Sequence, residues 1–494
     1  MAIRITGMNS GLDSDAMVKE LVKAYSKKTE KATKEKTKAE WKKDAYKDIN
    51  KKIKSFYTKL SDLKFDSAYQ LKKTASSDEN RVSVVASGNA VKGSQTVEVK
   101  ELATSGYLTS GKLKTFDDEK VTNDTSLSDL GLNVSDTFTV KKGNGEEITF
   151  DVDKDTKISD FVKFAKSAGL NANFDENNGR LFLSSKDSGA DENFTITSEN
   201  GADAILGLTE AKGASKIEGK DAKIILNGAE FTSSSNTFSV NGLNITAKGL
   251  TEKDNPIQIT TDTDYDKIYD TMKGFIKEYT SLINELDKLY NADSASKYSV
   301  LTSEEKEEMS DEEVEKWEGK IKDSLLRRDS SLSDVANAMK NAAVSSYEVN
   351  GKKMSLANIG IESLSYFLSA DNEKNALHIN GDADDEAVSG QENKLKAMLV
   401  SDTEGTVELF KQFVSEMDKT LTKLSASSSS RSFGNFYDDK NVEEDFKKKE
   451  EEVTKWEKYV QDMEDKWYAK FTQMEKAMGK LNSTQTNLSS YFGQ

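Results

Sequence analysis

The apolar residues near the end of the chain recur with the period of a coiled coil. Alternating steps of four and three residues from Val442 to Tyr491 meet fifteen positions, of which twelve are apolar. A repeat of 3.5 residues that persists this long predicts a helix whose apolar seam packs on another helix. About 51 residues would span roughly 75 Å at ~1.5 Å per residue, so a core helix of an ordinary bundle is the less favoured interpretation.

The N-terminal part of the chain carries a matching repeat that is weak in its middle. Asp13 or Ser14 is expected to cap a helix. The same steps of four and three then cover residues 18–63, but over residues 28–42 they meet only two alanines as apolar positions. This half of the helix is therefore expected to be marginal alone and to become ordered on assembly.

The two terminal helices are predicted to pair, because they match in length and differ in charge. Residues 15–65 hold 16 Lys against 8 acidic residues, whereas residues 442–492 hold 9 Lys against 11 acidic residues. The large Trp456 and Trp467 favour a seam that more than two helices share. The predicted pairing and self-association seam comprises Val18, Leu21, Tyr25, Tyr46, Ile49, Ile53, Phe56, Val453, Trp456, Val460, Met463, Trp467, Met474, Leu481 and Leu488.

After residue 63 the period of the pattern changes to 2, which is typical of strands with one buried face. Residues 136–152 are expected to form a hairpin that turns at Gly143-Asn144-Gly145. Its apolar residues face each other across the two strands, Phe138 and Val140 against Ile148 and Phe150. A short helix over residues 158–165 is expected to end near Gly169.

Further strands are expected before helical periodicity returns. Two lie around 181–183 and 194–196 and flank Asn178-Gly179, and a second set ends near Pro256 and runs through 224–226, 238–240 and 243–245. From Tyr265 a wide apolar stripe predicts a helix to about residue 289. Residues 303–345 are also expected to be helical, and the Ser-rich residues 425–432 are the expected linker before the last helix.

Composition excludes much of enzyme chemistry. The 494 residues contain no Cys and one His, which removes disulfides, thiolate sites and His-rich metal sites. The single Pro permits long helices. Residues 66–441 carry a net charge of −22, which disfavours nucleic-acid binding. No signal-peptide core and no apolar run of ~20 residues is present, so the chain is expected not to insert into a membrane.

Two segments imitate chemical sites without completing them. Asp151, Asp153 and Asp155 begin like a calcium loop, but Thr156 stands where the loop needs Gly and Val162 where it needs Glu. We therefore expect a solvated strand end. Gly143-Asn144-Gly145 lacks the third glycine of a dinucleotide loop and is interpreted as a turn.

Two other polar features are also expected to be structural. Asp382, Asp384, Asp385 and Glu386 are interpreted as an exposed loop, with adventitious cation binding as the alternative. His378 has no sequence neighbours that suggest a catalytic triad. We accordingly predict no catalytic, cofactor-binding or metal-binding residues and no enzymatic activity.

Several segments resemble one family of flagellar proteins. Residues 5–14, ITGMNSGLDS, followed by Met17-Val18-Lys19-Glu20-Leu21, resemble the opening of the filament cap family, hook-associated protein 2. Residues 237–286 resemble the β-to-helix junction of that family. Its later blocks are similar to LLRRDSSLSDV at 325–335, SLANIGI at 355–361 and WYAKFTQMEKAMGKLN at 467–482. The order and spacing of these blocks agree with the family, whereas residues 106–216 are matched only loosely.

The resemblance implies a structural role outside the cell. It implies export through the flagellar type III channel without a cleaved signal, with an export chaperone as partner. It further implies a homo-oligomer, a pentamer, at the distal filament tip. There the cap would prevent leakage of flagellin, promote flagellin folding and polymerisation, and so be required for filament elongation and motility. Host mucin or glycans are an additional partner class that the family suggests.

Together, the patterns and the resemblance predict an α+β multidomain fold with a coiled coil of terminal helices, a helical leg domain and two inserted β-rich domains. The expected domains are an N-terminal stalk helix at 1–45, the first helical part of the leg domain at 46–69, an inner β-rich domain at 70–105 and 217–262, an outer β-rich domain at 106–216, the helical leg domain at 263–440 and a C-terminal stalk helix at 441–494.

Two other functions are compatible with parts of this pattern. A hook–filament junction protein also has paired terminal helices but would lack the blocks at 237–286 and 325–361. A surface adhesin would use the β-rich insert to bind host glycans, and this activity could coexist with capping. An enzyme within the insert is the least favoured alternative.

Overall fold

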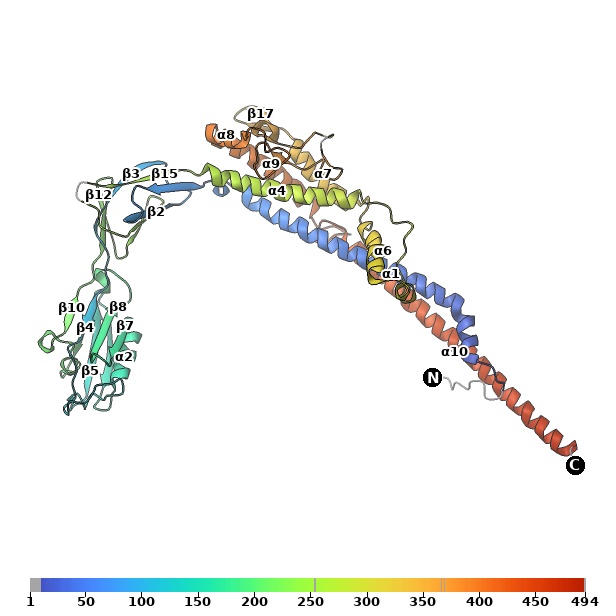
Figure 1. The fold of residues 1–494 in the computed structure, drawn as a ribbon, viewed down its shortest axis with the longest axis horizontal. Coiled ribbons are helices and arrows are strands. Elements are labelled where there is room, and N and C mark those ends of the chain that lie inside the picture. The colour runs from blue at the N-terminus through green and yellow to red at the C-terminus, as the bar shows by residue number, and fades with distance from the viewer. Residues whose placement is uncertain (1–9, 253–254, 366, 368, 493–494) are drawn as a thin grey trace. The chain divides into compact units, whose positions relative to one another are not determined.

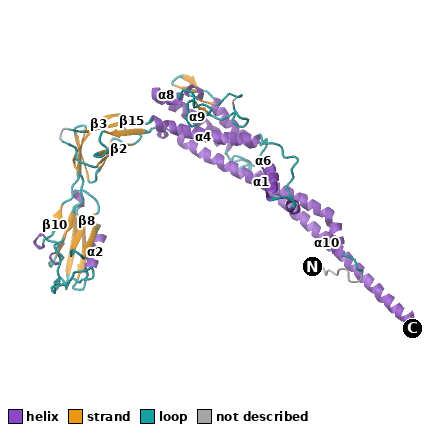
Figure 2. Ribbon diagram, in the orientation of Figure 1, coloured by secondary structure: helices purple, strands orange, loops and turns teal. Residues whose placement is uncertain are grey.

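The computed structural model describes residues 10–252, 255–365, 367 and 369–492 (Figures 1 and 2). The chain combines helices with several separate sheets and divides into two compact units. The helical unit contains residues 1–69 and 265–494, and the β-rich unit contains residues 70–264. Each unit is described by itself below.

The helical unit begins with one long helix, α1 (Ser14–Leu63), so the expected boundary at residues 45 and 46 falls inside a continuous helix. The Asp13 side chain caps it by accepting a hydrogen bond of 3.0 Å from the amide of Ala16. The other helices are α4 (Tyr265–Tyr290), α5 (Ser303–Glu307), α6 (Asp311–Asp323), α7 (Ser330–Val344), α8 (Lys394–Ser401), α9 (Thr403–Leu424) and α10 (Asp439–Phe492). Short strands complete the unit: β16 (Tyr347–Val349), β17 (Lys352–Met354), β18 (Ile361–Glu362) and β19 (His378–Ile379).

The predicted helical stretch 303–345 is interrupted twice, and polar caps explain where. Ser310 and Glu313 form a capping box at the start of α6. Asp329 accepts hydrogen bonds from the amides of Ser331 and Leu332 at the start of α7. The Ser-rich stretch lies between α9 and α10, as expected for a linker.

Aromatic side chains form the core of the helical unit. Phe275 of α4 lies 5.3 Å from Phe56 of α1, and 5.7 and 6.0 Å from Phe410 and Phe413 of α9, measured between ring centroids. Phe410 and Phe413 have no solvent exposure. The C-terminal half of α1 is therefore held by the helices of this core through close-packed rings.

The β-rich unit contains two groups of sheets. The first group consists of a five-stranded sheet in the order β1-β15-β3-β11-β12 and a three-stranded sheet β13-β14-β2. Its strands are β1 (Lys72–Ser76), β2 (Val82–Ala86), β3 (Gly93–Glu101), β11 (Ala222–Leu226), β12 (Ala229–Ser233), β13 (Thr237–Val240), β14 (Leu243–Ala247) and β15 (Ile257–Thr263). The second set of strands does not end near Pro256, because β15 follows this residue and pairs between β1 and β3.

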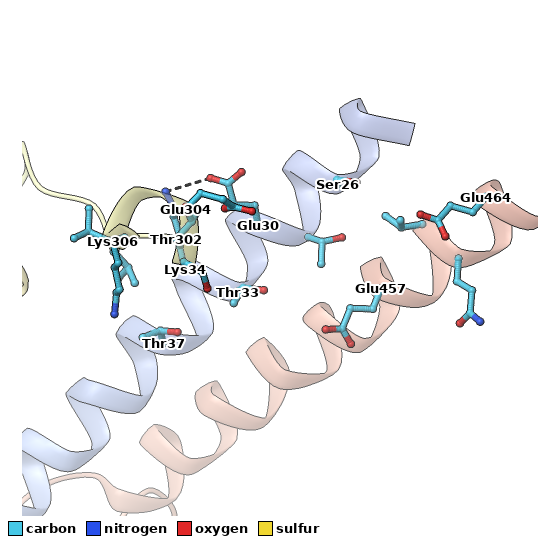
Figure 3. Close-up of a pocket in the computed structure, with 16 residues that line it drawn as sticks. Ser26, Glu30, Thr33, Lys34, Thr37, Thr302, Glu304, Lys306, Glu457 and Glu464 are labelled. Atoms are coloured by element: carbon cyan, nitrogen blue, oxygen red, sulfur yellow. Dashed lines mark ion pairs between the residues drawn. The ribbon is translucent and has the colours of Figure 1, made fainter. Parts of the chain in front are cut away.

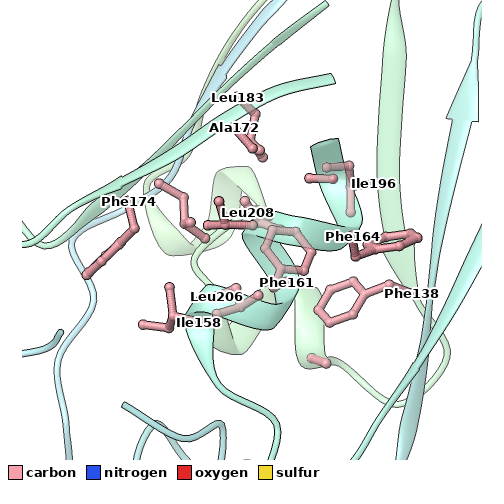
Figure 4. Close-up of a cluster of buried hydrophobic side chains, with 14 of the residues drawn as sticks. Phe138, Ile158, Phe161, Phe164, Ala172, Phe174, Leu183, Ile196, Leu206 and Leu208 are labelled. Carbon is pink, nitrogen blue, oxygen red and sulfur yellow. The ribbon is translucent and has the colours of Figure 1, made fainter. Parts of the chain in front are cut away.

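The second group consists of the sheets β10-β4-β8-β7 and β6-β5-β9, with α2 (Ile158–Ser167) and α3 (Ala202–Ile205). Its strands are β4 (Tyr107–Thr109), β5 (Asp136–Lys142), β6 (Glu147–Val152), β7 (Leu170–Asp175), β8 (Arg180–Ser185), β9 (Phe194–Ser198) and β10 (Ser215–Ile217). Figure 4 shows how α2 places Phe161 and Phe164 beside Phe138 of β5 in its core. The rings of Phe138 and Phe161 are 4.9 Å apart.

The predicted hairpin is confirmed in its register, because Phe138 is opposite Phe150 and Val140 is opposite Ile148. The prediction that strands around 181–183 and 194–196 flank Asn178-Gly179 is wrong. The strands on either side of this turn are β7 and β8, whereas β9 pairs with β5. Gly179 has a φ of +63°, which favours glycine at the turn between β7 and β8.

Candidate functional site

The two long helices α1 and α10 lie side by side and run in opposite directions (Figure 1). Tyr25 contacts Tyr459 with ring centroids 5.3 Å apart. Further along, Lys36 Nζ lies 3.4 Å from Glu450 and Lys43 Nζ lies 3.1 Å from Glu443. The partner number in α10 falls as the residue number in α1 rises, which defines an antiparallel register. We call this helix pair the stalk.

Apolar side chains close the stalk near the start of α1. Val18 and Val22 of α1 are 1% and 2% exposed and form a cluster with Tyr468 and Phe471 of α10. Around this cluster are packed the partly buried side chains of Tyr25, Met463, Trp467 and Met474. Burial of these side chains holds the two helices together at this end.

Polar contacts fix the register at the same end. The Tyr468 hydroxyl donates a hydrogen bond of 2.9 Å to the carboxylate of Asp15. The amide of Ser10 lies 3.3 Å from a carboxylate oxygen of Glu475, and the Ser10 hydroxyl also donates to this carboxylate. Glu475 is only 1% exposed, although it stands at a position that periodicity does not single out. No local sequence pattern indicates this contact, because its partners are 465 residues apart.

The structure distributes the predicted seam residues over three environments. Tyr25, Val453, Trp456, Val460, Met463, Trp467 and Met474 are buried or half-buried in the stalk. Leu21 is 40% exposed, and the neighbouring Val22 is the residue that packs against α10. Leu481 and Leu488 are 67% and 52% exposed, since α10 continues past the level at which Ser10 meets Glu475.

The remaining predicted seam residues of α1 are buried against other parts of the helical unit. Tyr46 stacks on Tyr437, with ring centroids 4.7 Å apart, and its hydroxyl donates a hydrogen bond to Asp329. Burial, together with this hydrogen bond, raises the pKa of Tyr46. Ile49, Ile53 and Phe56 are also buried, and Phe56 packs on Phe275 of α4.

A groove of about 740 Å³ opens where the predicted seam is weak (Figure 3). From α1 it is lined by hydroxyl side chains that include Thr29, Thr33 and Thr37, and from α10 by Glu457 and Glu464. The segment around α5 forms a further wall. The Thr29 hydroxyl is buried and has no hydrogen-bond partner among the residues that the structure describes. Small polar residues in place of large apolar ones leave the two helices incompletely packed here.

The acidic loop is organised around a lysine side chain. Lys273 Nζ of α4 lies 2.7 Å from the carboxylate of Asp384 and also contacts Asp382. Burial alone would lower the pKa of Lys273, but its hydrogen bonds to the two carboxylates raise it overall. The prediction that this loop is exposed is wrong for Asp382, which is 8% exposed. The lysine provides the positive charge that the buried carboxylate requires.

The contacts of His378 and of the Asp153 turn organise the local structure. His378 Nδ1 lies 2.6 Å from the carboxylate of Asp385, and its Nε2 is buried without a hydrogen-bond partner among these residues. The Asp153 carboxylate accepts hydrogen bonds from Thr156 and from the amide of Asp155, which lower its pKa and close a turn after β6. Among the described residues, no group of three or more His, Cys, Asp or Glu side chains could hold a metal ion.

We expect Lys273→Ala to destabilise the helical unit by about 1–3 kcal/mol, because it leaves the buried Asp382 without its positive partner. Lys316→Ala is the matched control. It removes an exposed ion pair with Glu312 within α6, and such pairs contribute less than about 0.5 kcal/mol. Chemical denaturation followed by circular dichroism measures both changes. Equal unfolding midpoints for the two variants would contradict the assigned role of Lys273.

Comparison with known proteins identifies the family. The profile for the flagellar hook-associated protein 2 C-terminus matches residues 219–483, and the profile for its N-terminus matches residues 10–106. The chain belongs to the flagellar hook-associated protein 2 family. It is 23% identical to flagellar hook-associated protein 2 of Halalkalibacterium halodurans over 99% of this chain and 100% of the relative. It is 25% identical to the A-type flagellar hook-associated protein 2 of Pseudomonas aeruginosa over 48% of this chain and 52% of the relative.

A solved structure supports the same fold. The crystal structure of the D1-D2-D3 domains of the flagellar cap protein FliD from Escherichia coli covers 81% of this chain and 99% of its own, with a TM-score of 0.57 and 20% identity. As a member of this family, the protein caps the flagellar filament and is a structural protein, not an enzyme. Family membership excludes the hook–filament junction alternative. Cap proteins of this family oligomerise at the flagellar tip and contact flagellin. Within the described residues, no helix is both long and apolar enough to cross a membrane.

Proposed function

We propose that this cap protein assembles as a homopentamer through its stalk. The observation that carries the proposal is the set of large apolar side chains left exposed at the stalk end, which comprises Leu12, Met17, Leu21, Leu481 and Leu488. Large apolar side chains that stay exposed along one end of a helix pair are available to the surface of a partner. A neighbouring copy would cover them at the filament tip, where the amphipathic ends of flagellin could also dock.

We also propose which part of the cap each of the other domains forms. The β-rich domains at 70–105, 106–216 and 217–262 would form the plate over the filament tip, and the helical domain at 263–440 the legs. The stalk helices at 1–45 and 441–494 would contact the filament. We further propose that an export chaperone delivers the unfolded chain to the flagellar type III channel, so that the protein reaches the cell exterior without a cleaved signal.

The decisive test is electron microscopy of flagella from a strain that lacks this protein. We expect such cells to have no filaments and to release flagellin into the medium, and we expect the wild-type gene to restore filaments. A gene that carries Leu481→Asp and Leu488→Asp should fail to restore them although the purified protein folds. Full-length filaments in the deletion strain would refute the capping role, and full complementation by the variant would refute the role of these two leucines.

The weak middle of the α1 seam leads to a further expectation. We expect residues 1–45 to exchange amide protons rapidly in the isolated monomer and slowly in the assembled cap, because assembly supplies the burial that residues 28–42 lack. Hydrogen exchange with mass spectrometry on both states measures this difference. The α4 helix, buried in the helical core in either state, is the internal control. Equal protection of residues 1–45 in monomer and cap would contradict the expectation.

One sheet surface favours glycan binding as a second function. The solvent face of β10-β4-β8-β7 exposes Ile217, Tyr107 and Phe182 by 60%, 51% and 43%. Asn171 and Asn173 lie on the same face, because they are opposite Ser184 and Phe182 in the register. Aromatic rings beside amide groups could stack on and hydrogen-bond to host mucin sugars. A glycan array with the full chain and with Tyr107→Ala/Phe182→Ala tests this, and binding unaffected by the substitutions would exclude this face.

A further inference from the structure

Two adjacent faces of the stalk carry unpaired charge of opposite sign. On one side, the groove between α1, α5 and α10 is lined by Glu304, Glu457 and Glu464. None of these three carboxylates has an ion-pair partner among the described residues. The lysines that line the same groove are already neutralised, since Lys34 Nζ lies 2.8 Å from Glu305 and Lys306 Nζ lies 2.6 Å from Glu318. We call this surface the acidic groove.

An adjacent face of α1 presents a row of lysines, with Glu35 beside them, and Glu30 and Lys34 lie between this face and the acidic groove. Lys27, Lys31 and Lys38 are spaced by about one and two helical turns and line a second groove of about 410 Å³ beside Tyr298. All three are exposed, and none has an ion-pair partner among the described residues. We call this surface the lysine row. A row of unpaired cations and a groove with unpaired carboxylates thus occur on adjacent faces of the same stalk.

The register of the stalk places the two surfaces at the same level. Lys28 Nζ lies 4.6 Å from the ring centroid of Trp456, so the neighbouring residues Lys27 and Glu457 are level along the stalk. If two copies stand parallel without an axial shift, the lysine row of one is level with the acidic groove of the other. A head-to-tail contact of this kind repeats from copy to copy and can close a ring.

We propose that the lysine row of one copy docks into the acidic groove of the next copy, and that this contact repeats around the cap. The inference rests on the proposed assembly through the stalk and names the surfaces that join neighbouring stalks. The charges are complementary, which sets the orientation of the partner and the register of the contact. The groove is also lined by Thr33, an exposed residue whose hydroxyl can accept a hydrogen bond from an incoming lysine ammonium.

Charge reversal tests the contact on the full chain. We expect Lys27→Glu/Lys31→Glu and Glu457→Lys/Glu464→Lys each to weaken self-association at least about tenfold, because each brings like charges together. The combined fourfold variant restores opposite charges in every contact and should associate like wild type. Glu451→Lys/Asp465→Lys is the matched control, since it makes the same change on exposed residues of α10 that do not line the groove.

Sedimentation velocity measures the oligomer mass, and far-ultraviolet circular dichroism establishes that each variant is folded. Wild-type association should weaken as the NaCl concentration is raised from about 0.05 to 0.5 M, since salt screens the contact. An oligomer mass that is unchanged in both double variants, or that stays low in the fourfold variant, would overturn the contact. Filament formation in the deletion strain is scored in parallel, so a wrong interface with normal capping is distinguished from a failure of the capping proposal.

Discussion

Trp467→Asp is expected to abolish self-association and motility while leaving the β-rich unit folded. Trp467 packs against the apolar cluster around Val18 and Val22, and its indole nitrogen is buried without a hydrogen-bond partner among the described residues. The substitution removes a large ring from the cluster and places a carboxylate among apolar side chains, which together cost on the order of 3 kcal/mol even though the Lys470 ammonium lies nearby. The start of α1 would then separate from α10, and the stalk end would lose the surface that assembly requires.

The measurement compares Trp467→Asp with Gln473→Asp, which adds the same charge at an exposed position of α10 six residues further along the chain. Sedimentation velocity gives the oligomer mass, and swarming on soft agar gives motility. We expect wild-type behaviour from Gln473→Asp and monomers without swarming from Trp467→Asp. Thermal melts should retain the transition of residues 70–264 in both variants. Normal swarming by Trp467→Asp with an unchanged oligomer mass would contradict the role of the seam.

The stalk illustrates what periodicity can and cannot establish. Apolar spacing located both terminal helices, because a long repeat outweighs the uncertainty at any single residue. It placed Leu21 in the seam and missed Val22, since a step of three and a step of four from Val18 are equally compatible with 3.6 residues per turn. Periodicity also does not show which other element an apolar helix face packs against. The core of the helical unit, not α10, therefore receives Phe56.

Long-range polar contacts leave no local signal in the sequence. No lysine or arginine lies between residues 375 and 393, so the sequence around the acidic loop does not show what neutralises it. Its partner Lys273 is 109 residues from Asp382 and becomes a neighbour only when α4 packs beside the loop. Glu475 likewise resembles any other charged residue of α10 until the register of the stalk brings Ser10 to it. Such contacts follow from the assembled fold and not from residue spacing.

Local sequence also gives little indication of strands β7 and β12. Buried residues alternate regularly in β7, but Asn171 and Asn173 stand between them, and asparagine is depleted in strands. In β12, no residue is fully buried, so the alternation that marks a half-buried strand is absent. Pairing with a neighbouring strand stabilises both segments in the folded chain. This tertiary effect overrides local propensity, which is all that a single sequence provides.

Asp136→Ala is expected to destabilise the β-rich unit by about 3 kcal/mol, because it removes a charged acceptor from three buried or partly buried backbone donors. The Asp136 carboxylate, in a residue that is 4% exposed, accepts hydrogen bonds of 2.8 Å from the amides of Thr137, Asn200 and Ala202. These bonds join the start of β5 to the turn before α3. Asp151→Ala is the control, since it removes an exposed carboxylate nearby that accepts a hydrogen bond from the Thr137 hydroxyl and from no other side chain that the structure describes.

The pH dependence of stability tests whether the negative charge of Asp136, and not only the shape of its side chain, stabilises the fold. Burial tends to raise the pKa of Asp136, but the hydrogen bonds from the three amides lower it overall. The folded pKa therefore lies below the unfolded value of about 3.9. The stabilisation is fully present above the unfolded pKa and is lost as the pH falls through the folded pKa. Urea unfolding of wild type and of Asp136→Asn is measured between about pH 2 and 6. We expect the free energy of unfolding to fall less at acid pH in the variant than in wild type. Parallel pH dependences of the two free energies would show that the Asp136 charge does not stabilise the fold.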